Sequence, residues 1–100
     1  MQGLFKQDKM FHKGTTNYDF GGVSHDFIFP NGYGAKVART PRTGGYERGL
    51  WEIVVTYEGK PTYDNIPFEW KGLTWLTSSQ VEVILQKISD IPFKVKKVLE

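Results

Sequence analysis

The sequence predicts an α+β fold in which an antiparallel sheet of three to four strands is packed by one C-terminal helix. The first observation is a set of three runs between residues 23 and 57 whose side chains alternate with a two-residue period, as strands require. Segments rich in Gly, Pro and Asn separate these runs and indicate turns. The second observation is a helix-capping motif at 77–80, followed by apolar residues at helical spacing.

The length of 100 residues fits a single domain, and 39% hydrophobic residues with 15% aromatic residues suffice for a modest core. We expect this core to cover residues 23–91. Residues 1–22 are poor in branched apolar side chains, and we expect a flexible arm or a short strand around residues 10–12. Residues 92–100 form a tail with alternating apolar and basic side chains, which is typical of a short edge strand or a frayed end.

The first two strands are expected to form a hairpin. The first run, Val23–Phe29, ends at Pro30-Asn31-Gly32, and Asn-Gly tolerates the positive φ that a hairpin turn needs. A second strand should therefore return directly from Tyr33. Its opposite face carries Lys36 among small residues, which leaves room for close approach. Val23, His25, Phe27 and Phe29 share one face of the first run, and Tyr33, Ala35 and Val37 share one face of the second.

The third strand is the run Leu50–Tyr57, which places Trp51, Ile53, Val55 and Tyr57 on one face. The loop that precedes it, 40–49, is too long for a tight hairpin and is rich in Gly, Thr and Arg. We expect a protruding, mobile loop that contacts a partner, with an ordinary flexible connection as the alternative.

The helix is expected to begin at the capping box Thr77-Ser78-Ser79-Gln80, in which Thr77 accepts from the Gln80 backbone N–H while Gln80 reaches back. Its apolar face, which should pack on the sheet, consists of Val81, Ile84, Leu85 and Ile88. Ile91-Pro92 ends it. The preceding segment, 61–76, is irregular but apolar, and we expect it to cover the edge of the core.

The sequence offers few groups for catalysis or metal binding. It contains no Cys and only two His, His12 and His25, which lie far apart in the sequence and show no pairing with a nucleophile. Asp26 follows His25 directly, but neighbours in a strand point to opposite faces. No glycine-rich segment has the pattern of a phosphate-binding loop. We therefore expect neither an enzyme nor a cofactor or metal site. The chain also lacks a long apolar run and a signal-peptide pattern, so we expect a cytoplasmic protein without membrane contact.

Binding is the function class that the sequence favours. The net charge is only +2, but cations dominate the first half of the chain and anions dominate residues 46–90. This pattern is typical of an ordinary solvated surface, with a steered partner as the alternative. Arg, Tyr and Trp are enriched at protein interaction hot spots, and they recur in the second and third strands and their loop. A protein partner is the main hypothesis. The candidate contact residues are Tyr33, Lys36, Arg39, Arg42, Tyr46, Arg48 and Trp51.

Two other functions remain open at this point. The same cations and aromatic rings could bind nucleic acid or a nucleotide, because single strands need phosphate contacts and stacking. Against this, Glu47, Glu52 and Glu58 lie close to the same segment. A structural or assembly role as a homodimer would bury the sheet face that one helix leaves uncovered.

Several motifs resemble small uncharacterised proteins encoded in bacteriophage genomes. They include Asn31-Gly32-Tyr33-Gly34 and Gly49-Leu50-Trp51-Glu52, followed by Tyr63-Asp64-Asn65-Ile66-Pro67 and Leu76-Thr77, and the resemblance covers about residues 23–88. It implies a phage protein that binds and inhibits a host protein, such as a defence factor, in the host cytoplasm. The basic N-terminal arm and the Lys-rich tail depart from this pattern.

Overall fold

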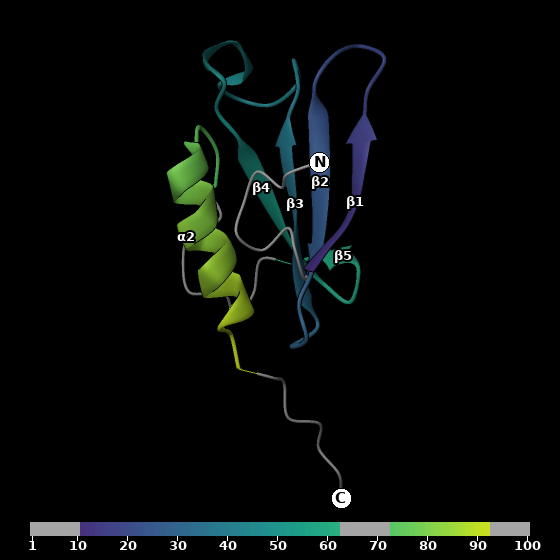
Figure 1. The fold of residues 1–100 in the computed structure, drawn as a ribbon, viewed down its shortest axis with the longest axis vertical. Coiled ribbons are helices and arrows are strands. Elements are labelled where there is room, and N and C mark those ends of the chain that lie inside the picture. The colour runs from purple at the N-terminus through teal and green to yellow at the C-terminus, as the bar shows by residue number, and fades with distance from the viewer. Residues whose placement is uncertain (1–10, 63–72, 93–100) are drawn as a thin grey trace, which may run out of the picture.

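The computed structural model describes residues 11–62 and 73–92 of the chain. Over these residues it contains a five-stranded antiparallel sheet packed against one C-terminal helix, so the predicted α+β class is confirmed. The strands lie in the sheet in sequence order, with the helix along one side of the sheet in Figure 1. The elements are β1 (His12–Asn17), β2 (Val23–Ile28), β3 (Tyr33–Arg39), the 3-10 turn η1 (Tyr46–Arg48), β4 (Glu52–Tyr57), β5 (Lys60–Pro61) and α2 (Ser78–Ser89).

The strand count differs slightly from the three to four that the sequence predicts. β5 adds only two residues, and β1 begins at His12 and runs through a polar segment to Asn17, beyond the expected 10–12. β1 is an edge strand with mostly exposed side chains, and its register with β2 shifts at a bulge between His12 and Gly14. Such a strand shows no apolar alternation, so its bounds cannot be predicted from the sequence pattern. The strand considered for the tail lies outside the described residues.

The core lies between one face of the sheet and α2. Its strand residues include Phe27, Phe29, Tyr33, Ala35, Val37, Ile53 and Val55, each at most 3% exposed. The helix contributes Val81, Leu85 and Ile88, which are 0% exposed and belong to the same apolar cluster. These are the faces that the two-residue and helical periods predict. Because burying one such side chain stabilises the fold by about 1.5–3 kcal/mol, this cluster is the main source of stability.

The predicted hairpin and capping box are both present. Phe29 donates its backbone N–H to the Tyr33 carbonyl at 2.8 Å, and Gly32 takes the positive φ of 88° that the turn requires. At the start of α2, the Gln80 N–H donates to the Thr77 hydroxyl at 3.2 Å, and the Thr77 N–H donates to the Gln80 side chain at 2.9 Å. The turn between β2 and β3 and the start of α2 therefore both follow from local sequence chemistry.

Asn31 ties the hairpin to the end of the helix. Its side-chain amide donates to the backbone carbonyls of Ile88 at 2.9 Å and Ile91 at 2.8 Å, and its side-chain oxygen accepts the Tyr33 N–H at 2.9 Å. Asn31 is only 4% exposed. The last carbonyls of a helix have no hydrogen-bond partner within the helix. The buried side-chain amide of Asn31 donates to them in place of water.

Candidate partner-binding surface

The β3–β4 loop folds on itself through hydrogen bonds of its own. The Thr43 hydroxyl donates to the Thr40 carbonyl at 2.9 Å and accepts the Thr40 N–H at 3.0 Å. The Gly45 carbonyl then accepts the N–H groups of Arg48 and Leu50, both at 3.0 Å, which closes the 3-10 turn. The sequence predicts a mobile loop. In the structure, short Thr side chains and the left-handed Gly45 allow the backbone N–H and C=O groups of the loop to hydrogen-bond within the loop. The loop thus presents its remaining side chains on a folded support.

Three arginines at this end of the sheet each lie over an aromatic ring. The guanidinium carbon of Arg39 is 4.3 Å from the centre of the Trp51 ring, and that of Arg42 is 4.3 Å from the centre of Phe20. Arg48 lies 5.6 Å from the centre of Trp75. All three fall within the range of about 6 Å in which a cation is attracted to a ring face. These contacts hold the guanidinium groups in place without using their in-plane N–H donors.

Two of these pairs face solvent. Trp75 is 52% exposed and Phe20 is 45% exposed, and the side chains of Arg42 and Arg48 are also exposed. Within residues 11–62 and 73–92, neither arginine forms an ion pair with a carboxylate closer than 4.0 Å. We call the residues Phe20, Arg42, Tyr46, Arg48 and Trp75 the loop-end surface. Its guanidinium donors and apolar rings are available to a second molecule.

Trp75 is held outward by its backbone. It has φ 60°, a left-handed conformation that is costly for a large side chain. Its neighbour Leu76 is 5% exposed and exchanges two backbone hydrogen bonds with Trp51, at 2.7 and 2.9 Å. Because Leu76 is fixed against the core, the indole of Trp75 is directed to the surface. Backbone strain that surrounding contacts maintain at an exposed aromatic residue is a feature of functional sites.

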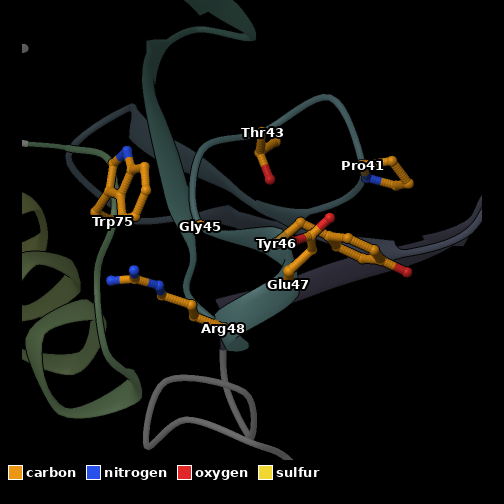
Figure 2. A pocket seen from close by; sticks show the side chains of 7 residues that line it. All are labelled: Pro41, Thr43, Gly45, Tyr46, Glu47, Arg48 and Trp75. Atoms are coloured by element: carbon orange, nitrogen blue, oxygen red, sulfur yellow. The ribbon is translucent and has the colours of Figure 1, made fainter.

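A surface pocket of about 440 Å³ lies between η1 and Trp75. In the view of Figure 2, Trp75 and Arg48 lie on one side of it, and Tyr46, Glu47 and Pro41 on the other. Gly44 packs against the indole so closely that a Cβ there would lie 2.6 Å from Trp75 Nε1. The pocket therefore combines a fixed apolar wall with one cation and one anion. The residues that line it are Pro41, Thr43, Gly45, Tyr46, Glu47, Arg48 and Trp75.

The turn between β1 and β2 extends the loop-end surface beyond the pocket. A Cβ on Gly21 would lie 3.2 Å from the Tyr46 hydroxyl oxygen, so the two turns are in contact. In the same turn, the rings of Tyr18 and Phe20 lie 5.1 Å apart. Phe20 thus contacts both Tyr18 and Arg42, and the surface continues from Trp75 across η1 to the turn between β1 and β2.

The structure brings together three of the seven predicted contact residues, Arg42, Tyr46 and Arg48. Arg39 lies beside them but is folded back, because it stacks on Trp51 and donates to the Gly49 carbonyl at 3.2 Å. The remaining three lie elsewhere. Trp51 and Tyr33 are 0% and 1% exposed in the core, with Tyr33 at the opposite end of β3, and Lys36 is exposed on the other face of that strand.

Sequence reasoning did not include Phe20 and Trp75 among the contact residues. Phe20 stands next to Gly21-Gly22 in a turn, and an aromatic residue within such a turn is a signal for surface exposure. No comparable signal exists for Trp75, because it stands between buried Leu73 and Leu76 in an irregular segment. Its exposure depends on the backbone conformation described above.

The two histidines are far apart in the sequence but close together in the fold. Pairing of β1 with β2 brings the rings of His12 and His25 to within 5.5 Å, centre to centre. Even so, no three His, Asp or Glu side chains within the described ranges cluster so that they could hold a metal ion. The described part of the chain also has no helix of the length and apolar character that crossing a bilayer requires.

Comparison with known proteins provides no relatives. No protein-family model, no curated protein and no solved structure matches the chain.

Proposed function

We propose that this chain is a non-catalytic binding protein of the bacteriophage type, which engages a host protein through the loop-end surface and blocks it. The observation that carries the proposal is the set of arginine–aromatic pairs around the pocket, two of which face solvent. Arg and Trp are the residue types that contribute most binding energy at protein interfaces.

The loop-end surface is also prepared for binding before a partner arrives. The loop backbone is closed by its own hydrogen bonds, and each arginine already rests on a ring. Ordering a long side chain on association costs about 0.5–1.5 kcal/mol, so side chains that are already ordered lose less entropy. Exposed Trp75 would supply apolar area at the centre, and the guanidinium donors would pair with polar groups at the rim.

Binding of single-stranded nucleic acid is the second candidate. Exposed Phe20 and Trp75, each beside an arginine, could stack bases while Arg42 and Arg48 contact phosphates. Glu47 disfavours this function, because its carboxylate lines the same pocket and would repel a polyanion. A protein partner, which presents both charges, fits the mixed charge of the pocket better.

Affinity capture from a bacterial host lysate tests the proposal. The bait is the wild-type protein or the double variant Trp75→Ala/Arg48→Gln, and captured proteins and nucleic acids are both identified after low-salt and high-salt washes. A matched control, Val83→Ala/Lys36→Gln, removes one exposed apolar side chain and one exposed cation away from the loop-end surface. We expect one stoichiometric protein that survives high salt with the wild type and the control but not with the double variant.

The other outcomes separate the alternatives. Nucleic acid that is lost at high salt would support the second candidate, because phosphate contacts release counterions and weaken steeply with salt. A partner that the Trp75→Ala/Arg48→Gln bait retains as well as the wild type would refute the assignment of this surface. If nothing is captured and the mass in solution is twice 11.5 kDa, self-assembly becomes the better explanation.

A further inference from the structure

The second feature of the molecule that suggests a ligand is the pair of histidines on β1 and β2. Thr15 lies opposite His25 in the strand register, and its hydroxyl oxygen is 3.0 Å from His25 Nδ1. The same oxygen is 2.9 Å from His12 Nε2. Two imidazole nitrogens therefore converge on a single point, from opposite strands.

The β-bulge is the reason for this convergence. Residues three apart on a regular strand point to opposite faces, so His12 and Thr15 would normally be separated by the sheet. The register shift between His12 and Gly14 inserts one extra residue and turns His12 to the same face as Thr15. Bulges re-aim side chains in this way at functional sites.

We propose that His12 and His25 bind a divalent transition-metal ion of the zinc, nickel or copper type. Neutral imidazole is the preferred ligand of these ions. Two imidazoles that share one ion through bonds of about 2.1 Å at a tetrahedral angle have ring centres about 5 Å apart. The observed separation of 5.5 Å, with the planes at 56°, needs only a small rotation of the rings.

The surroundings leave one side of this site open for the ion. His25 is 6% exposed and its ring lies 5.8 Å from Trp51, whereas His12 is half-buried and its ring lies 5.5 Å from Phe27. Thr15 is exposed, so an ion enters from its side and replaces the hydrogen bonds of its hydroxyl. Water completes the coordination. Binding links β1 to β2 and stabilises the edge of the sheet, because the ion binds only the folded arrangement.

The test is a titration of the full chain, without a histidine tag, with ZnCl₂ and with MgCl₂ as the control ion. The chain has only two histidines, so the imidazole proton signals in NMR spectra report on this site alone. We expect both imidazoles to shift with zinc along one saturable one-to-one curve, and neither to shift with magnesium. The thermal midpoint should rise with zinc and return to its starting value with a chelator.

Two variants separate metal binding from a structural role of the cluster. His12→Asn removes one ligand and should weaken zinc binding by at least about tenfold. Thr15→Val removes the hydroxyl but keeps both imidazoles, and zinc should still shift both signals. The proposal fails if zinc shifts only one imidazole, if the two shifts give different affinities, or if zinc doubles the mass by joining two chains. None of these measurements involves the loop-end surface. Failure of the metal site would therefore leave the proposed function untouched, and failure of the proposed function would leave the metal site untouched.

Discussion

The two ends of the sheet use similar polar and aromatic residues in opposite ways. At the hairpin end, Asn31 is 4% exposed, and its side-chain amide donates to the Ile88 and Ile91 carbonyls at the end of α2. At the loop end, Trp75 and Phe20 are 52% and 45% exposed, and the guanidinium carbon of exposed Arg48 lies 5.6 Å from the centre of the Trp75 ring. One end satisfies its polar groups within the fold, and the other leaves them for a second molecule.

This difference separates residues that maintain the structure from residues that meet a partner. Substitutions at the hairpin end should change the free energy of unfolding. Those at the loop end should change binding and leave stability nearly as it is.

Asn31→Ala should give the largest loss of stability, about 3 kcal/mol in the free energy of unfolding, because it leaves buried backbone groups without partners. Urea denaturation followed by Trp fluorescence measures the change. The matched variant Asn31→Asp keeps the acceptor for the Tyr33 N–H but loses the donors to Ile88 and Ile91, and it should lose most of the same stability. Unfolding midpoints equal to the wild type would contradict the account of this end.

Trp75→Ala should reduce partner affinity by about 30-fold or more, as expected for an interface hot spot. The half-exposed indole contributes little to the core, so the unfolding midpoint should change only slightly. Surface plasmon resonance with the captured partner measures the affinity. Val83→Ala serves as a control for loss of an exposed apolar side chain. An affinity unchanged by Trp75→Ala would remove Trp75 from the interface.

Arg39 and Arg42 are neighbours in the chain with opposite expected roles. Arg39→Gln removes the contact with Trp51 and the hydrogen bond to Gly49, so it should destabilise the fold by about 1 kcal/mol. Arg42→Gln should leave stability unchanged within about 0.5 kcal/mol, because Arg42 stacks only on exposed Phe20. Binding should weaken in the second variant. The reverse assignment would follow if Arg42→Gln were the destabilising change.

A pair of variants at position 75 measures the backbone strain. Trp75→Gly and Trp75→Ala both remove the indole, but only glycine adopts φ 60° without a steric penalty. Trp75→Gly should therefore be more stable than Trp75→Ala by up to about 1 kcal/mol, despite the greater freedom of glycine in the unfolded chain. Equal stability of the two variants, compared by thermal and urea unfolding, would show that the left-handed backbone costs nothing here.

Local patterns were sufficient to predict much of the fold. The strand faces of β2, β3 and β4, the Asn31-Gly32 turn and the capping box at Thr77 each follow from chemistry within a few residues, and the structure contains all of them. β1 was placed only roughly, because its exposed polar side chains lack the alternation that buried strands have. Predictions for segments outside the described residues, including most of 61–76, stay predictions.

The candidate site was less accessible to sequence reasoning. Trp51 was grouped with the arginines because it is near them in the sequence. The two-residue strand period can place Trp51 in the core, but it does not predict that Arg39 stacks on its ring. Trp75 joins the loop through tertiary contact with Gly44, over a separation of about thirty residues that no local pattern spans. The approach of His12 to His25 depends on a bulge, and a single inserted residue has no signature in this sequence.

The most direct test of the central claim is site-specific photo-crosslinking in bacterial cells. A photoreactive phenylalanine analogue is placed in turn at Tyr46, at Trp75 and, as the control, at Val83 on the exposed side of α2. We predict that Tyr46 and Trp75 crosslink to the same host protein and that Val83 does not. Crosslinks from Val83 alone, or equal crosslinks to many proteins from all three positions, would contradict the claim that the loop-end surface is the partner-binding site.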